Sequence, residues 1–149
     1  MEIADPISSV LVNKGSDLWT TSPEITVFDA IKVMSQKNIG ALPVMAGTKL
    51  VGIVSERDYM RKVVLEGKSS KETMVSEIMT TTLFTATTRD SVEKSMFAMT
   101  QHRVRHLPVL DDGQLIGIVT IGDLVKWTIS AQGAVIDQLE GYIKGSYPG

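Results

Sequence analysis

The sequence predicts a mixed α/β (α+β) fold made of two pseudo-symmetric β-α-β-β-α repeats that pack sheet to sheet. The first observation is an internal duplication, because a Leu-Pro-Val segment followed by a Gly-Ile-Val segment occurs twice. The spacing is 65 residues in each case, from Pro43 to Pro108 and from Gly52 to Gly117. The second observation is that helical and extended patterns alternate within each copy. Two copies are too few for a solenoid, so we expect a pseudo-symmetric pair with any ligand between the copies.

An amphipathic helix is predicted early in each copy. Thr26 precedes apolar residues at positions 27, 31 and 34, and Asp90-Ser91 precedes apolar residues at 92, 96 and 99. This spacing places the apolar side chains on one helix face, and a preceding Thr, Ser or Asp caps the free N–H groups. A second helix is predicted in each copy, at residues 58–65 and 123–131.

Two extended segments follow the first helix of each copy, at residues 39–45 and 50–54 and at residues 104–110 and 115–119. They are rich in β-branched residues and are separated by short turns, of which Asp112-Gly113 is a strong hairpin signal. The Gly-Ile-Val runs are apolar without alternation, which indicates strands buried on both faces. We therefore expect a three-stranded sheet in each copy, with the helices on one face.

The period divides the chain into repeat 1 at residues 8–66, a polar linker at 67–73 and repeat 2 at 74–131. Residues 10–14 and 75–79 are the expected starting segments of the two copies. Residues 132–149 form a C-terminal tail, in which apolar residues at helical spacing predict an amphipathic helix over 134–143.

Composition excludes several classes of protein. The 149 residues are 43% hydrophobic and 21% charged with a net charge of −2, which does not favour nucleic acid or an acidic membrane as a partner. No apolar run reaches the roughly 18 residues of a membrane span, and the first residues do not resemble a signal peptide, so we expect a cytoplasmic protein. The sequence has no cysteine, which removes disulfides and thiolate chemistry.

The duplicated Leu-Pro-Val strand, Gly-Ile-Val strand and Ser/Thr-x-x-Asp exit resemble the cystathionine-β-synthase (CBS) domain pair, also called a Bateman module. The resemblance covers residues 10–127 and implies a nucleotide-sensing module rather than an enzyme. It implies AMP, ADP, ATP or NAD(H) as ligands, with S-adenosylmethionine less favoured. It also implies a homodimer in which four repeats form a disc, and a regulated partner protein of unknown identity.

The Ser/Thr-x-x-Asp motifs are Ser55 with Asp58 and Thr120 with Asp123. Such a motif at the start of a helix is typical of a capping box, which needs only backbone amides as partners. The resemblance implies a second role, in which the Asp accepts hydrogen bonds from a ribose diol and the Ser or Thr donates to phosphate. Both readings remain open at this point.

Arg105 and His106 precede the second Leu-Pro-Val, whereas the equivalent residues of the first copy, Gly40 and Ala41, carry no charge. The resemblance implies phosphate contact at the basic pair, so the two sites are expected to differ. Arg103 is two residues from Arg105, which predicts that both side chains point to the same face of a strand.

The resemblance adds residues expected to line the adenine and ribose. These residues are Lys14, Ile39, Pro43, Val54, Arg57, Thr80, Val104, Pro108 and Val119. Trp19 and Phe84 are expected to pack in the core. His102 and His106 are four residues apart but lack further ligand types nearby, so a metal site is not expected.

Three classes of function compete. An enzyme is not expected, because no candidate nucleophile has an identifiable base and no phosphate-binding Gly-rich loop or dinucleotide fingerprint is present. The sequence favours a nucleotide sensor. The alternative is a ligand-free dimerisation scaffold, in which Asp58 and Asp123 only cap helices.

Overall fold

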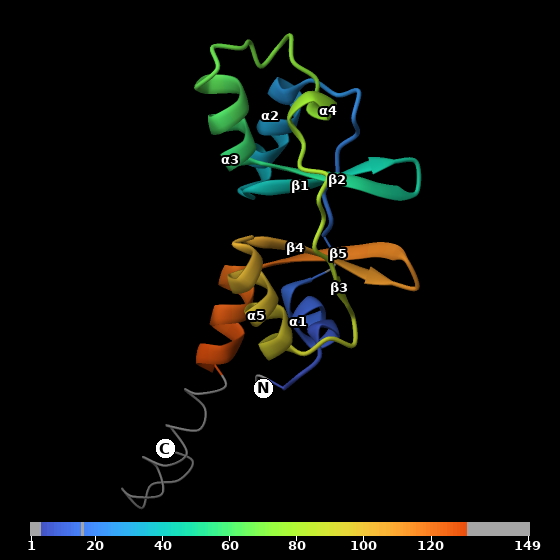
Figure 1. Cartoon of the computed structure of the whole chain (residues 1–149). Helices are drawn as coiled ribbons and strands as arrows, with labels where there is room; N and C mark the ends of the chain where they lie inside the picture. Colours follow the sequence, from blue (N-terminus) through green and yellow to red (C-terminus); the bar gives the residue numbers. More distant parts are fainter. Residues whose placement is uncertain (1–3, 16, 131–149) are drawn as a thin grey trace, which may run out of the picture. The chain divides into compact units, whose positions relative to one another are not determined.

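The structure is a computed structural model that describes residues 4–15 and 17–130, and it divides into two compact units (Figure 1). The first unit is built on strands β1 (Ala41–Ala46) and β2 (Lys49–Ser55), and the second on β4 (His106–Asp111) and β5 (Gln114–Thr120). The predicted helix at 134–143 lies outside the described residues.

In the first unit, the helices lie on one face of the β1–β2 hairpin (Figure 1). They are α2 (Val27–Lys37), α3 (Glu56–Tyr59), its π-helical continuation η1 (Met60–Val64) and α4 (Val75–Ile78). Helix α2 begins as predicted, because the Thr26 hydroxyl accepts a hydrogen bond from the Asp29 amide at 3.2 Å. It ends at Asn38, which adopts the left-handed conformation with φ 55°.

The sheet of the first unit differs from the predicted three strands. β1 and β2 pair antiparallel, and the third strand is reduced to a single parallel bridge between Thr21 and Val44. The Thr21 amide donates to the Pro43 carbonyl, and the Thr21 carbonyl accepts from the Met45 amide, at 3.0 and 2.8 Å. Among the described residues, these two bonds are the pairing that this short segment makes with β1.

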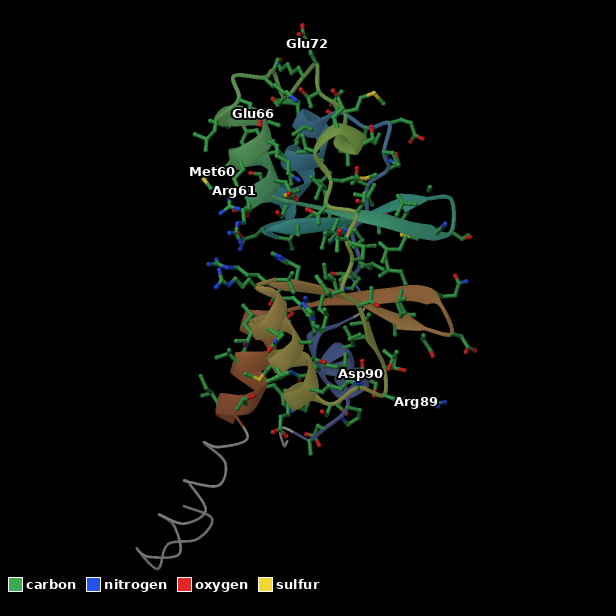
Figure 2. The ribbon with its side chains drawn as sticks, viewed as in Figure 1. Met60, Arg61, Glu66, Glu72, Arg89 and Asp90 are labelled. Carbon is green, nitrogen blue, oxygen red and sulfur yellow. The ribbon has the colours of Figure 1, made fainter. Side chains whose placement is uncertain are left out.

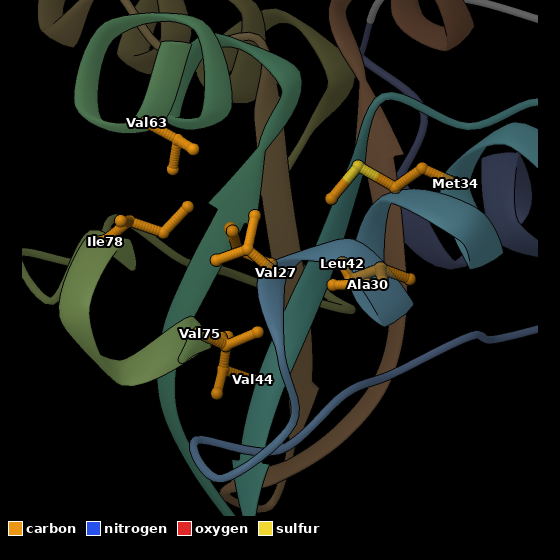
Figure 3. Close-up of a cluster of buried hydrophobic side chains, with 9 residues drawn as sticks. Val27, Ala30, Met34, Leu42, Val44, Val63, Val75 and Ile78 are labelled. Atoms are coloured by element: carbon orange, nitrogen blue, oxygen red, sulfur yellow. The ribbon is translucent and has the colours of Figure 1, made fainter. Parts of the chain in front are cut away.

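The core of the first unit lies between the hairpin and the helices (Figure 3). Its members are apolar side chains that are at most 3% exposed: Val27, Ala30, Met34, Leu42, Val44, Val54, Val63, Val75 and Ile78. Helices α2, η1 and α4 contribute to it, and Tyr59 of α3 packs against it. Burial of these side chains is the main source of stability for a unit of this size.

The second unit repeats this plan with a longer third strand. Strand β3 (Ala86–Thr87) pairs parallel with β4, giving the sheet order β3-β4-β5. Helix α1 (Ile7–Lys14), helix α5 (Val92–His102) and a helix at residues 121–130 belong to this unit. The predicted Asp112-Gly113 turn is confirmed, because both residues have positive φ values of 51° and 77°.

The units are composed differently from the sequence repeats, because each takes its starting helix from the other copy. Helix α1 belongs to the second unit, where the Ile7 amide donates to the Asp90 carbonyl at 2.8 Å. Helix α4 belongs to the first unit, where the Val75 amide donates to the Ile25 carbonyl at 2.8 Å. The predicted boundaries therefore describe the sequence period, while backbone hydrogen bonds decide which segments pack together.

Three predictions about local structure are wrong. The second helices start earlier than predicted, at residues 56 and 121, because Ser55 and Thr120 are the capping residues. Arg103 is not in a strand, since it ends α5 in the left-handed conformation. Trp19 is 40% exposed rather than core, and its ring lies 4.1 Å from the Lys37 ammonium.

Candidate ligand-binding site

Each unit contains a carboxylate cluster at the start of the helix that follows its hairpin. In the first unit the Ser55 hydroxyl accepts a hydrogen bond from the Asp58 amide at 3.2 Å, and Asp58 Oδ2 accepts from the Ser55 amide at 3.0 Å. The capping box predicted from the sequence is therefore confirmed here. The ligand reading uses the same two side chains and stays a prediction.

Both oxygens of the Asp58 carboxylate are occupied. Oδ2 also accepts from the Ser55 hydroxyl at 3.1 Å, while Oδ1 accepts from the Thr80 hydroxyl and lies 3.1 Å from the Lys62 ammonium. Lys62 donates in addition to the Ile78 carbonyl at 2.8 Å. Asp58 is only 8% exposed, so this buried carboxylate is held by neutral and cationic donors together.

The second unit has the equivalent box with fewer contacts. The Thr120 amide donates to Asp123 Oδ2 at 2.9 Å, and the Asp123 amide donates to the Thr120 hydroxyl at 3.0 Å. Among the described residues, Asp123 Oδ1 accepts no hydrogen bond. The Asp123 side chain is also more accessible than that of Asp58, at 25% against 11%.

Lys14, the last residue of α1, supplies the cation of this second cluster. Its ammonium lies 2.7 Å from Asp123 Oδ2 and donates to the Ile118 carbonyl at 2.9 Å. In the first unit the equivalent carbonyl, that of Ile53, accepts instead from the Thr80 amide at 2.8 Å. A lysine side chain in one unit thus takes the place of a backbone segment in the other.

Burial and charge shift two pKa values in the second cluster. Burial alone raises the pKa of Asp123, but the hydrogen bonds and charge of Lys14 and the Thr120 bonds outweigh it, so the pKa lies below its usual value. The pKa of His106 is also lowered, first by burial and then by the positive charge of Lys14 and Arg105, which Asp123 partly offsets. The histidine is therefore neutral at pH 7 beside two cations.

The other predicted residues of the first unit divide into accessible and enclosed groups. The Gly40 carbonyl accepts from the Glu56 amide at 3.0 Å, so Gly40 and Ala41 lie beside the capping box. Ile39 is half-buried, and Arg57 is exposed on α3. Two predicted contacts, Pro43 and Val54, are buried, and protein atoms enclose their side chains.

The predicted residues of the second unit also fall into an accessible and an enclosed group. The Arg105 carbonyl accepts from the Ile121 amide at 2.9 Å, and His106 begins β4, so both lie beside the Thr120 box. Val104 is half-buried, whereas Pro108 and Val119 are buried. Phe84, which belongs to the first unit and was expected in the core, is half-buried. Among residues 4–15 and 17–130, no group of acidic or histidine side chains could hold a metal ion.

Sequence reasoning missed Lys62, which contacts the Asp58 carboxylate from one turn further along the helix. The signal was available, because Asp and Lys four residues apart on a helix face each other. Lys14 was predicted to line the site, but not to pair with Asp123, from which it is separated by 109 residues. No local pattern predicts a contact at that distance.

Glycines in the two Gly-Ile-Val strands lie against the segments that supply Thr80 and Lys14. A Cβ on Gly52 would lie 3.0 Å from the Thr80 carbonyl oxygen, which the Ile53 amide holds in place. A Cβ on Gly117 would instead meet the Leu11 Cδ2 atom at 2.8 Å, at the end of a flexible side chain. Both contacts are too close for the present structure, but only the second can be relieved by a rotamer change.

Gly52→Ala is therefore expected to lower the free energy of unfolding by about 2 kcal/mol, because the Thr80 backbone must move. Gly117→Ala serves as the matched control, with an expected loss under about 1 kcal/mol. Urea unfolding followed by circular dichroism measures both. Equal losses would show that the Thr80 segment is not fixed by its pairing with Ile53.

A family model for the CBS domain matches residues 8–65 and 75–130. The chain belongs to the CBS domain family. It is 42% identical to the Arabidopsis thaliana CBS domain-containing protein CBSX3, mitochondrial, over 95% of this chain and 73% of that protein. The match to two copies of one domain confirms the resemblance inferred from the repeats.

Solved structures of CBS proteins share this fold. A putative signal-transduction protein with CBS domains from Burkholderia ambifaria MC40-6 matches with a TM-score of 0.81 and 48% identity, covering 85% of this chain and 96% of that one. The CBS domain pair of protein MJ0100, solved in complex with 5′-methylthioadenosine and S-adenosyl-L-methionine, matches with a TM-score of 0.77 and 26% identity. That match covers 86% of this chain and 98% of the MJ0100 chain. No helix within the described part of the chain has the length and apolarity needed to cross a membrane.

Proposed function

We propose that this chain is a regulatory CBS module that binds adenosine nucleotides at its two carboxylate clusters and passes the signal to a partner protein. The observation that carries the proposal is the duplicated Ser/Thr-x-x-Asp box with an accessible carboxylate in the second unit. The complex of MJ0100 with two adenosine-containing ligands supports it. The expected cytoplasmic location is part of the same proposal.

The chemistry of the second cluster suits a nucleotide. A carboxylate can accept two hydrogen bonds from a ribose 2′,3′-diol, and Asp123 Oδ1 has room to accept, since no described residue donates to it. Thr120, Arg105 and Lys14 supply donors and positive charge for phosphate. A sensor of this kind needs no nucleophile, because the signal is carried by binding and release of the ligand and not by a reaction. For that signal to pass, the ligand must bind two states of the module with different affinities.

A thermal-shift panel with AMP, ADP, ATP, NAD⁺, NADH and S-adenosylmethionine tests the proposal. A ligand at about 100 times its dissociation constant stabilises the native state by about 2.7 kcal/mol, which raises the melting temperature by several degrees. A shift with one of these ligands supports the sensor and names its signal. No shift with any of them would contradict it and favour the scaffold, in which both aspartates are helix caps only.

A second observation favours a homodimer, which is compatible with either role. The second helix of each unit exposes an apolar pair one turn apart, Met60 with Val64 in the first unit and Val125 with Ile129 in the second. Figure 2 shows Met60 and Arg61 on the helix of the first unit. The two pairs occupy equivalent positions of the repeat, so a second copy presents the same two pairs, as a two-fold interface requires.

Introducing charge into both pairs, as Val64→Glu with Ile129→Glu, is expected to convert a dimer into a monomer. Burying two carboxylates without partners costs several kcal/mol, more than a modest interface provides. Light scattering coupled to gel filtration measures the mass. Val12→Glu, which places the same charge on an exposed apolar residue of α1, is the control. An unchanged mass in the double variant would exclude these pairs from the interface.

A further inference from the structure

We propose that Lys14 makes the second cluster selective for phosphorylated ligands, because a ligand that takes Asp123 must provide a new anion for the lysine. This inference rests on the proposed function and names the ligand class of one of its two clusters. Lys14 acts as a specificity-determining residue, because Asp123 must leave its ion pair with Lys14 before its carboxylate can bind a ribose.

The starting state is an ion pair with one further bond. The Lys14 ammonium lies 2.7 Å from Asp123 Oδ2 and donates to the Ile118 carbonyl at 2.9 Å. The Lys14 side chain is 33% exposed and that of Asp123 is 25% exposed. The pair is therefore partly withdrawn from water, where an ammonium that loses its anionic partner is poorly compensated.

Ribose binding changes the partners of this pair. When two ribose hydroxyls donate to the Asp123 carboxylate, they compete with the ammonium for its oxygens, and Lys14 keeps only the Ile118 carbonyl. A neutral nucleoside offers nothing in exchange. A nucleoside phosphate carries its own anion beyond the ribose, and the flexible lysine stem can turn its ammonium to that anion.

The surrounding charges reinforce this selection. Arg105 directly precedes His106, the first residue of β4, and its carbonyl accepts from the Ile121 amide beside the Thr120 box. The positive charges of Lys14 and Arg105 both lower the pKa of His106. Asp123 is the anion that balances them. Once ribose hydroxyls engage Asp123, two cations face one shared carboxylate, so a phosphate is favoured electrostatically.

The first cluster offers a weaker form of this exchange. Asp58 Oδ1 is held by the neutral Thr80 hydroxyl, which can leave without exposing a charge. Lys62 also contacts Asp58, but it retains the Ile78 carbonyl and is 42% exposed to water. Gly40 and Ala41 stand where the second unit has Arg105 and His106. A nucleoside without phosphate therefore meets a smaller electrostatic cost here than at Asp123.

Titrations of the ¹⁵N-labelled full chain with adenosine, AMP and inorganic phosphate separate the two clusters. The amides of Ile118 and Asp123 report on the second cluster, and those of Ile53 and Asp58 on the first. At the second cluster we expect half-saturation by AMP at a concentration about tenfold lower than by adenosine, the ratio for one charged hydrogen bond. Lys14→Gln is expected to reduce that ratio to less than about threefold, while Lys14→Arg retains it.

Lys62→Gln is the matched control, because it removes the lysine of the other cluster and should leave the ratio at Ile118 and Asp123 unchanged. If Lys14→Gln fails to fold, the salt dependence of binding to the unaltered chain tests the same point. The preference for AMP over adenosine should shrink between low and high salt, since screening weakens the ammonium–phosphate attraction.

Three outcomes would overturn the inference while leaving the proposed function standing. They are equal affinities for adenosine and AMP at the second cluster, an unchanged ratio in Lys14→Gln, and a preference that salt does not alter. Binding of inorganic phosphate as tightly as AMP would also overturn it, because the ribose would then play no part. A chain whose amides respond to none of the three ligands, nor to the wider panel, would remove the proposed function itself.

Discussion

Asp58→Ala is expected to lower the free energy of unfolding by about 3 kcal/mol, because it removes a helix cap and the buried acceptor that three side chains share. The carboxylate accepts from Ser55, Thr80 and Lys62, and the residue is only 8% exposed. The cap alone is worth about 1 kcal/mol, and the remainder comes from the hydrogen bonds that the Ser55 and Thr80 hydroxyls lose and from the lost ion pair with Lys62. Urea unfolding followed by circular dichroism measures the loss.

The natural control is Asp123→Ala, which removes the equivalent cap from the second unit. Its partners are Thr120 and Lys14, and the Asp123 side chain is 25% exposed against 11% for Asp58, so water reaches more readily the groups that lose the carboxylate. We expect a loss of about 1 kcal/mol. If Asp58→Ala cost no more than Asp123→Ala, the contacts of Thr80 and Lys62 with Asp58 would have no part in stability.

Asp123→Ala is expected to reduce nucleotide affinity at the second cluster about 100-fold while the protein stays folded, since it removes both charged acceptors of the ribose hydroxyls. Calorimetric titration with the ligand that gives the largest thermal shift measures the change. The effect exceeds that expected from loss of one neutral hydrogen bond, because the acceptor is ionised and partly buried.

Glu93→Ala removes one negative charge from an exposed position of α5 and controls for the change in net charge. Its affinity should remain within about twofold of the original, because exposed charges are screened over short distances. An unchanged affinity in Asp123→Ala would show that the carboxylate is a helix cap and no more. Replacing Asp58 is thus predicted to affect mainly the stability of the protein, and replacing Asp123 mainly its nucleotide binding.

The stability of the Asp123 interactions should also depend on pH. The pKa of Asp123 is lowered in the folded state, so its contribution is present above the unfolded value near 4 and is lost as the pH falls through the folded value. The pKa of His106 is lowered as well, so protonation below about pH 6.5 opposes folding. Both groups therefore make the second unit less stable in acid.

Features that depend on neighbouring residues could be predicted from the sequence. The repeat predicted two similar units, Thr26 and Ser91 predicted helix starts, and Asp112-Gly113 predicted a hairpin. Each is a local effect, since a cap, a turn or an apolar face needs only residues within one or two turns of chain. For the same reason the capping partners of Asp58 and Asp123 could be predicted three residues away.

The further groups that each aspartate contacts depend on how distant segments of the chain pack together. The sequence placed α1 with the first copy, but its backbone hydrogen bonds join it to the second unit, which brings Lys14 to Asp123 across 109 residues. Thr80 reaches Asp58 from the segment after α4 in the same way. Such contacts depend on where a whole helix packs, and the packing of apolar faces is non-directional, so no period or spacing in the chain encodes them.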